Sequence, residues 1–321
     1  MMLTLAEKIY GSLSGSYHRK WDKRGGWKAP VPVISVGNIT VGGNGKTPFT
    51  IELVRLLSDR FESLRGENGI AILSRGYGRR AKDLCVVQTD ADFKESGDEP
   101  LLIKRNSPSA LVIAYANRVE SARFAVEHFG AKLIILDDGF QHRPLARDLD
   151  IVLLDSERPL GNGHLLPAGR LRERPAALNR TDLIVSVGQE GAAEAIALKI
   201  GKPLMHATTN TSVPEGLASR MGPVYLLTAI ARSSRVRQTA EDMKLNVVGH
   251  ARFRDHHAFS GKELDTADQT ARKLGASAIL TTSKDMIRIP SWHGNLPLFE
   301  IPFRISLAES DQLLSRVEGL L

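Results

Sequence analysis

The chain has 321 residues, of which 42% are hydrophobic, and this is enough to bury a substantial core over an expected two domains. Lys and Arg number 43 against 36 Asp and Glu, and the formal net charge of +7 favours phosphate-rich ligands or anionic membrane surfaces. Aromatic residues make up only 6% and do not interleave with a basic stretch, so we expect no nucleic acid partner. The single cysteine, Cys85, excludes a disulfide framework and fits a cytoplasmic protein.

The first 28 residues combine an apolar helical stripe with basic residues and two tryptophans. Helical spacing places four apolar side chains on one face, Met2, Ala6, Ile9 and Leu13. Glu7 and Lys8 interrupt the segment, so no uncharged run reaches the roughly 20 residues that a membrane span needs. Two interpretations stay open: a helix packed on the domain, or a membrane-docking helix with Trp21 and Trp27 at headgroup depth.

From residue 31 onward, short apolar runs rich in β-forming residues alternate with helical patterns. The runs are VPVISVG, GIAILSRG, LVIAY, KLIILDDG, DIVLLDS and DLIVSVG, and the helical patterns include 46–60 and 117–129. Continuously apolar strands are covered on both faces, which is typical of a parallel sheet between helices. We therefore predict an α/β fold with a mostly parallel sheet flanked by helices.

A second, shorter alternation follows the turn-rich stretch TTNTSVPEGLASRMGP. It contains VYLLTAIA, VVGHARF and AILTTSKD, and it ends in the helical pattern LAESDQLLSRVEGLL. This predicts a first domain over residues 1–215 and a smaller α/β domain over 216–321, with a final helix that could pack on either.

The stretch GNITVGGNGKTPFT lies between the first strand and a helix that begins near Lys46. This is the context of a P-loop, in which backbone amides and a lysine hold nucleotide phosphates and the hydroxyl of Thr47 would ligate magnesium. Thr40 occupies the place of the usual first glycine, while Gly42 and Gly43 add flexibility inside the loop. The large sheet is therefore predicted to be P-loop NTPase-like, and a glycine turn without a ligand is the alternative.

The stretch KLIILDDGFQHR carries a second nucleotide motif, in which Asp137 and Asp138 directly follow four apolar residues. P-loop proteins place a carboxylate at the end of a neighbouring buried strand to position the metal ion. The two acids could instead cap a following turn, but the two motifs together favour a nucleotide site.

Phosphoryl transfer also needs a group that orients or deprotonates the acceptor. In ESGDEPLLIKR, Asp98 precedes an apolar helical run, a position where a carboxylate is usually a helix cap or dipole partner. In RFRDHHAFS, a histidine could share a proton with a carboxylate across a cleft. A zinc pair formed by His256 and His257 is the rival, although adjacent histidines point apart. The residues alone favour capping for Asp98.

Residues 157–180 form a long connection that is dense in arginine, glycine and proline. Connections of this length in compact domains are usually functional or disordered. Arginines here could hold phosphate, but spacing alone does not rank Arg170, Arg172 and Arg174.

The chain resembles the tetraacyldisaccharide 4'-kinases, which phosphorylate the lipid A precursor on the inner face of the bacterial inner membrane. The similarity covers almost the whole chain and rests on motifs in a fixed order, SVGNITVGGNGKTP, ILSRGYGR, GDEP, ANRV, ILDDGFQHR, LLPAGRLRE, DHHAF and TTSKD. The resemblance implies an ATP- and Mg²⁺-dependent kinase of lipid A biosynthesis. Its substrate would be an acylated glucosamine disaccharide 1-phosphate, and it would be peripheral to the cytoplasmic face of the inner membrane.

The resemblance also implies roles for particular residues. The nucleotide-binding residues are Thr40, Val41, Gly42, Gly43, Asn44, Gly45, Lys46, Thr47, Gln141 and Glu173. The metal ligands are Thr47, Asp137 and Asp138. The catalytic residues are Asp98, His256, Lys46 and Arg172. The family match thus assigns Asp98 as the base rather than a cap, with His256 as its partner.

Two departures from the family pattern fall in the second domain. Ser283 stands in TTSKD where glutamate is common, and AIARSSRV replaces a more glycine-rich stretch, so nucleotide-base contacts there stay open. Two other function classes also stay open. A P-loop ATPase or GTPase switch would leave Asp98 and His256 idle, and a non-enzymatic membrane-surface protein would explain only the charge and the first helix.

Overall fold

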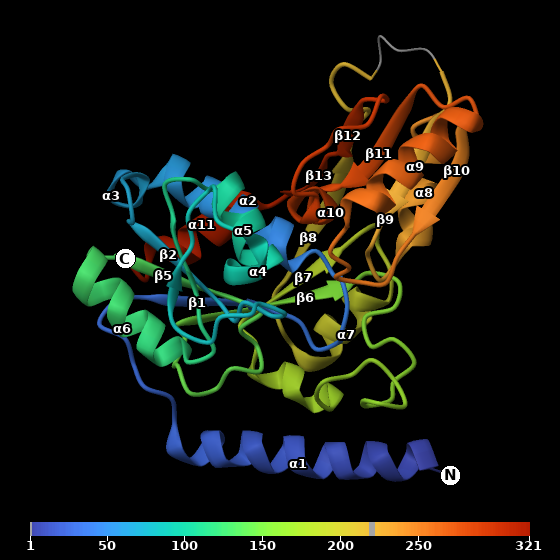
Figure 1. The fold of residues 1–321 in the computed structure, drawn as a ribbon. Helices are drawn as coiled ribbons and strands as arrows, with labels where there is room; N and C mark the ends of the chain where they lie inside the picture. Colours follow the sequence, from blue (N-terminus) through green and yellow to red (C-terminus); the bar gives the residue numbers. More distant parts are fainter. Residues whose placement is uncertain (1, 218–221) are drawn as a thin grey trace. The chain divides into compact units, whose positions relative to one another are not determined.

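The structure is a computed structural model that describes residues 2–217 and 222–321. The chain divides into two compact units, the first made of Met1–Thr209 with Ile305–Leu321 and the second of Asn210–Arg304. Each unit contains its own sheet (Figure 1). The second unit therefore ends before the predicted range 216–321 does. The reason is that β13 (Phe303–Leu307) joins the large sheet and α11 (Ser310–Glu318) packs on α2 (Lys46–Arg60).

The large sheet has the strand order β13-β8-β7-β6-β1-β5-β2-β4-β3 among the described residues. Its other strands are β1 (Val33–Gly37), β2 (Ile70–Ser74), β3 (Cys85–Val86), β4 (Leu111–Ala114), β5 (Leu133–Asp137), β6 (Leu149–Asp155), β7 (Leu183–Val187) and β8 (Leu204–Thr211). The run from β8 to β4 pairs in parallel, and β3 pairs antiparallel with β4. Every residue of β1, β2, β4 and β5 is buried, as expected for strands covered on both faces. The predicted α/β fold with a mostly parallel sheet is confirmed.

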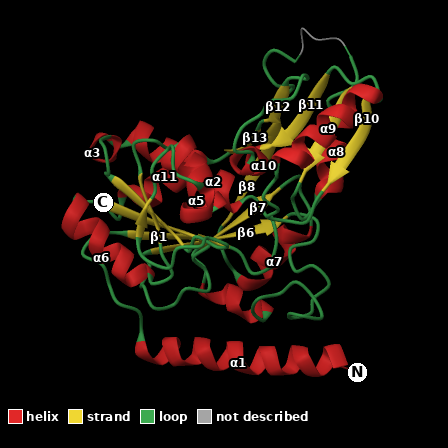
Figure 2. Cartoon of the chain, viewed as in Figure 1, coloured by secondary structure: helices red, strands yellow, loops and turns green. Residues whose placement is uncertain are grey.

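Helices cover both faces of this sheet. The remaining helices of the first unit are α1 (Met2–Arg24), α3 (Glu62–Arg65), α4 (Phe93–Ser96), α5 (Asp98–Asn106), α6 (Arg118–Phe129), the 3₁₀ helix η1 (Pro175–Arg180) and α7 (Ala192–Ile200). Figure 2 shows α2, α5 and α11 on one side of the sheet and α6 and α7 on the other. The predicted helical patterns 46–60 and 117–129 correspond to α2 and α6.

The carboxyl ends of the central strands meet at one edge of the large sheet. The register pairs Val36 with Asp137 and Leu73 with Leu136. Because these strands are parallel, the loops that follow β1, β2, β4 and β5 all leave from this edge. We call it the large-sheet edge.

The second unit has a parallel four-stranded sheet of order β10-β9-β11-β12 within the described residues. Its strands are β9 (Val224–Thr228), β10 (Val247–Arg252), β11 (Ala278–Thr282) and β12 (Leu298–Ile301), and its helices are α8 (Ser233–Asp242), α9 (Gly261–Lys273) and α10 (Ser283–Arg288). Helix α9 begins at a capping box formed by Ser260 and Glu263. Its apolar residues Leu264, Ala267 and Ala271 are buried in the core.

Helix α1 exposes apolar side chains to solvent, whereas the apolar residues of α9 are buried. Four apolar or aromatic side chains four residues apart are exposed, Leu5 (61%), Ile9 (54%), Leu13 (68%) and Tyr17 (42%). We call these four the α1 stripe. Ala6 of the predicted stripe is half-buried, and the side chain of Met2 lies outside the described residues. No described helix is long and apolar enough to cross a bilayer.

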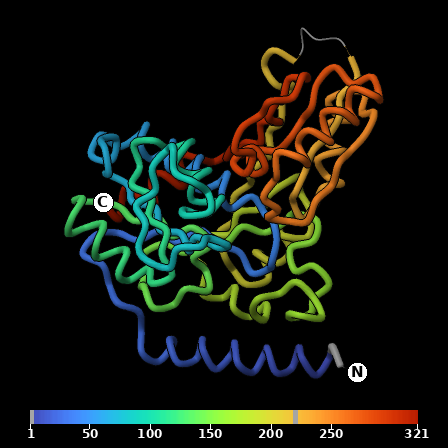
Figure 3. The backbone as a smooth tube through the Cα atoms, viewed as in Figure 1, coloured from blue at the N-terminus to red at the C-terminus, as the bar shows by residue number. Residues whose placement is uncertain are grey.

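The inward face of α1 is held by polar contacts instead. The carboxylate of Glu7 accepts from Leu165 N at 2.8 Å, and the Tyr10 hydroxyl donates to the Arg172 carbonyl at 2.9 Å. Both partners belong to the segment between β6 and β7, which runs beside α1 (Figure 3). Trp27 is half-buried and packs on the first-unit core; the placement of Trp21 and Trp27 at headgroup depth stays a prediction.

Candidate active site

The glycine-rich loop at the large-sheet edge leaves the start of α2 open to an anion. Gly45 caps this helix with φ 78°, in the left-handed region, and has no side chain to fill the space before the first amides. A Cβ at Gly45 would also lie 2.7 Å from Ile305 Cδ1. Gly43 is exposed and Gly42 is half-buried at the tip of the loop. This geometry suits phosphate binding by backbone N–H groups.

A strand-like segment of the 157–180 connection braces this loop. Thr40 forms an antiparallel bridge with Leu171, and Val41 N donates to the Arg170 carbonyl at 2.8 Å. The Arg170 guanidinium in turn donates to the Val41 carbonyl at 2.6 Å. Thr40 Oγ1 accepts from Asn44 Nδ2 at 2.8 Å. The loop conformation is therefore fixed by hydrogen bonds at the place where a glycine was expected.

Two cations converge on Asp138. Lys46 Nζ lies 3.5 Å from Asp138 Oδ1, and Arg172 Nη1 donates to both Asp138 oxygens at 2.9 and 2.8 Å. Burial would raise the pKa of Asp138, but Lys46 and Arg172 lower it to about 2. The carboxylate is ionised, and the cations around it can also meet the charge of a phosphate. The structure thus places Arg172 at the loop, while Arg174 is exposed.

The neighbouring acid, Asp137, is deeply buried. It is the last residue of β5 and accepts from Thr50 Oγ1 and Ser74 Oγ, each at 3.4 Å. Thr47 is buried in the first turn of α2. No group of three or more His, Cys, Asp or Glu side chains forms a metal cage within the described residues. Oxygen donors of this kind fit Mg²⁺, which usually takes one or two carboxylates and completes its shell with phosphate oxygens and water.

Gln141 contacts the Arg172 side chain, and Glu173 contacts Gln141. Gln141 Oε1 accepts from Arg172 Nη1 at 3.1 Å, and Gln141 Nε2 donates to Glu173 Oε1 at 3.1 Å. Glu173 is 4% exposed and also accepts from Arg180 Nη2 at 2.6 Å. His18 of α1 lies 3.1 Å from Glu173 Oε2, and burial lowers the pKa of His18 despite this carboxylate. The contacts of Gln141 and Glu173 therefore hold an arginine in place.

Asp98 is the first residue of α5, and Gly97 rather than Asp98 is the cap. The Asp98 side chain is 6% exposed, and its Oδ1 accepts from Glu99 N at 2.9 Å. A Cβ at Gly97 would lie 3.1 Å from Gly76 Cα, so this turn lies against the segment that follows β2. Asp98 thus belongs to the large-sheet edge, where it also favours the start of its own helix.

Sequence reasoning missed two arginines at this edge. Arg118 is the first residue of α6 and is 5% exposed; burial lowers its pKa to about 10, although Asp138 opposes this. Arg75 follows β2 and acts on Arg118 electrostatically. Burial and these arginines also lower the pKa of His142 to about 3. Both arginines occur in the motifs ILSRGYGR and ANRV, and the signal that could have found them is their position just after strands at the same edge.

The DHH segment follows β10 in the second unit. His256 has a left-handed φ of 61°, and its Nδ1 lies 3.2 Å from Arg288 Nη2. His257 Nε2 instead lies 3.1 Å from Glu263, and its ring stacks on Phe253. The two histidines therefore have different partners, which gives no support to a zinc pair. Ser283 Oγ donates to Glu300 Oε1 at 2.5 Å.

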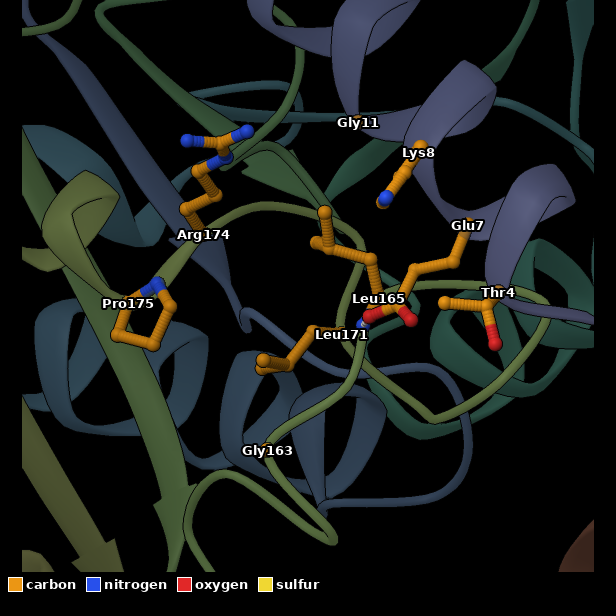
Figure 4. A pocket seen from close by; sticks show the side chains of 9 residues that line it. All are labelled: Thr4, Glu7, Lys8, Gly11, Gly163, Leu165, Leu171, Arg174 and Pro175. Carbon is orange, nitrogen blue, oxygen red and sulfur yellow. Dashed lines mark hydrogen bonds between the residues drawn. The ribbon is translucent and has the colours of Figure 1, made fainter. Parts of the chain in front are cut away.

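A hollow of about 340 Å³ lies between α1 and the 157–180 connection (Figure 4). Leu165 and Leu171 give it an apolar floor. Lys8 and Arg174 place cationic groups on its wall. Glu7 also lines it, so the hollow joins an apolar surface with two cationic groups and one carboxylate.

Proteins of one family match the chain along most of its length. The family model described as tetraacyldisaccharide-1-P 4'-kinase matches residues 1–321. A tetraacyldisaccharide 4'-kinase of Anaeromyxobacter sp. (strain Fw109-5) is 42% identical over 82% of this chain and 74% of its own length. That of Koribacter versatilis (strain Ellin345) is 37% identical over 89% and 88%.

A solved structure is also similar. The crystal structure of LpxK from Aquifex aeolicus, described as in complex with ATP, has a TM-score of 0.78 and 29% identity, and it covers 99% of this chain and 98% of its own. Sequence and fold agree over nearly the full length. The chain therefore belongs to the tetraacyldisaccharide 4'-kinase family.

Proposed function

We propose that this kinase works at the large-sheet edge, where it transfers the γ-phosphate of ATP to the 4'-hydroxyl of the tetraacyldisaccharide 1-phosphate precursor of lipid A. Family membership gives the reaction. The observation that carries its placement is the cluster in which Lys46 and Arg172 converge on Asp138 beside the glycine-rich loop.

Residues 40–47 would bind the nucleotide phosphates. The amides at the start of α2 would meet phosphate oxygens, and Lys46 and Arg172 would neutralise the charge that shifts during transfer. Thr47, Asp137 and Asp138 would hold Mg²⁺, which when bound neutralises phosphate charge. Gln141 and Glu173 would keep Arg172 in the orientation that transfer requires.

Asp98 would accept the proton of the 4'-hydroxyl. Its burial at the large-sheet edge supports this role over that of a surface helix-dipole partner. A carboxylate is a weak base, so most of the rate must come from positioning and charge neutralisation. His256 of the second unit would assist this step, and mutation tests this pairing directly.

The α1 stripe would dock on the cytoplasmic surface of the inner membrane. An exposed apolar stripe beside basic residues is typical of helices that lie in a membrane interface. The substrate carries acyl chains, which stay at the bilayer while its sugar reaches the large-sheet edge. The hollow between α1 and the 157–180 connection lies beside this docking face and would accept part of the lipid.

The test is incubation of the purified protein with Mg·ATP and acylated glucosamine disaccharide 1-phosphate, followed by mass spectrometry. We expect one added phosphate, with fragmentation placing it at the 4'-position. ATP hydrolysis without lipid phosphorylation would favour a P-loop ATPase and overturn the proposal. A Lys46→Ala protein is the negative control.

A further inference from the structure

Arg288 has no role in the kinase chemistry described above, yet it is the largest fully buried side chain among the described residues, at 1% exposed. It ends helix α10 (Ser283–Arg288). Burying a guanidinium is costly unless its charge is paired and its N–H groups are bonded. Its partners therefore indicate what the burial achieves.

One terminal nitrogen is held by two acceptors. Arg288 Nη1 donates to the Ala229 carbonyl at 2.9 Å and lies 3.3 Å from Asp285 Oδ1. Asp285 is held in turn by Thr282 Oγ1 at 2.8 Å. His256 N also donates to the Ala229 carbonyl, at 3.2 Å. The guanidinium is thus fixed at the carboxyl end of β9, on the same acceptor that holds the DHH segment.

The other terminal nitrogen meets the imidazole. Arg288 Nη2 lies 3.2 Å from His256 Nδ1. A guanidinium has N–H donors only and keeps its charge, so Nδ1 is the acceptor in this pair. A neutral imidazole that accepts at Nδ1 carries its proton on Nε2.

We infer that Arg288 is a positioning residue that fixes the tautomer of His256, with the proton on Nε2, so that His256 serves the reaction as a hydrogen-bond donor. A second proton on Nδ1 would set an N–H group and a positive charge against the guanidinium. Asp255 Oδ2, 3.8 Å from Nε2, is the nearby acid on the same segment. The inference rests on the proposed role of His256 and specifies it: His256 acts as a donor through the N–H of Nε2, and Nδ1, which accepts from Arg288, takes no proton from the reaction.

The tautomer can be observed without any assay of activity. In the full-length protein labelled with ¹⁵N-histidine, we expect His256 to show a protonated Nε2 and an unprotonated Nδ1 that accepts a hydrogen bond. In Arg288→Met the Nδ1 signal should move to that of a nitrogen without this bond, or show a proton. A proton on Nδ1 in the wild type, or an unchanged Nδ1 signal in Arg288→Met, would overturn the inference.

Kinetics test whether Arg288 acts through His256. Arg288→Met should lower kcat about 10- to 100-fold, the rate equivalent of one charge-assisted hydrogen bond. In a His256→Ala background the same change should cost less than about 2-fold, because the imidazole it orients is gone. Arg288→Lys, which keeps a cationic donor, should recover part of the loss. Equal losses in both backgrounds would show that Arg288 acts only through the stability of the unit.

Two further variants keep the test decisive. Because Arg288→Met leaves Asp285 as a buried carboxylate without its cation, the paired Asp285→Asn/Arg288→Met protein removes both charges together and should fold; it is measured in the same two backgrounds. His257→Ala is the matched control background, in which the full effect of Arg288→Met should persist. If His256→Ala alone retained full activity, the proposed role of His256 would fail, and the ¹⁵N spectrum would still decide the tautomer.

Discussion

The two sheets each carry a charged cluster at their carboxyl edge, and the clusters differ in exposure and balance. At the large-sheet edge, the Asp138 side chain is 30% exposed and Lys46 and Arg172 both contact it. In the second unit, Asp285 and Arg288 form a one-to-one pair at 0% and 1% exposed. In the first cluster two cations contact one carboxylate, so positive charge remains for an incoming anion. In the second cluster one cation and one carboxylate neutralise each other.

This difference indicates what each cluster can do. Spare cations at a partly open edge stabilise charge that arrives with a substrate, so their loss should lower turnover more than stability. A closed pair contributes orientation, and breaking it leaves a buried charge, so its loss should lower both. The variants below test this contrast, from the largest expected effect to the smallest.

The largest effect should come from Asp98. Asp98→Ala and Asp98→Ser should each lower kcat by roughly 10²- to 10⁴-fold, as expected for loss of a general base. Serine is the sharper variant because it keeps a polar group at this buried position while it removes the base. Steady-state lipid phosphorylation and thermal melts distinguish the two roles. A Ser variant with wild-type turnover would return Asp98 to the role of a helix-start residue.

Asp98 and His256 should act together in catalysis. The Asp98→Ala/His256→Ala protein should be little worse than the worse single variant. Fully additive losses in kcat would mean that the residues of the two units act independently.

Arg172 should come next. Arg172→Lys keeps the charge but loses the planar fork that contacts Asp138 and Gln141, so we expect a fall in kcat of roughly 10- to 10²-fold with a small change in melting temperature. Arg60→Ala is the matched control, because Arg60 is 55% exposed at the end of α2 that lies away from the large-sheet edge. Equal losses in the two proteins would show that general positive charge, and not the Asp138 contact, matters.

Asp138 gives a pH-dependent prediction. Its pKa falls from 3.8 to about 2 on folding, so its ionisation stabilises the protein above about pH 4, and this contribution is lost as the pH falls through about 2. Asp138→Asn should therefore lower the free energy of unfolding at pH 7 by on the order of 2 kcal/mol. The difference from wild type should shrink on acidification. Urea unfolding at several pH values measures it, and a constant difference would contradict the assignment.

The α1 stripe should affect membrane binding and neither charged cluster. Ile9→Ser/Leu13→Ser should weaken binding to anionic vesicles about 10-fold or more, since each buried leucine or isoleucine contributes roughly 1.5 to 3 kcal/mol at most. Leu198→Ser is the matched control, because Leu198 is 84% exposed on α7. Turnover on detergent-dispersed substrate should stay near wild type. Equal vesicle binding by all three proteins would assign the stripe to another contact.

The sequence predicts the central strands well, because a strand covered on both faces must be continuously apolar. It does not predict strands that form because of their place in the sheet and lack a continuous apolar pattern. The run of β8 (Leu204–Thr211) contains four exposed polar residues, and β3 (Cys85–Val86) is too short to show a period. The return of β13 to the large sheet is a long-range pairing that no local pattern encodes.

The site was predicted where chemistry is local to a motif. Lys46, Thr47, Asp137 and Asp138 fall in short motifs next to strands, and the structure brings Lys46 and Asp138 together. Arg118 was missed because its importance depends on the parallel register of β4 and β2, which aligns their carboxyl ends. Arg288 was missed because nothing in TTSKD and its neighbours signals a buried guanidinium. The positions of both arginines depend on contacts between segments that are far apart in the sequence.

The most direct measurement compares two lysines at opposite ends of the large sheet. Lys46 begins α2 at the carboxyl edge, and Lys132 is exposed just before the first residue of β5, at the other end. Transfer of radiolabelled γ-phosphate from ATP to the lipid should fall by about 10²-fold or more in Lys46→Ala and should be unchanged in Lys132→Ala, with circular dichroism showing that both proteins are folded. Lipid phosphorylation by Lys46→Ala within a few-fold of wild type would contradict the placement of the reaction at the large-sheet edge.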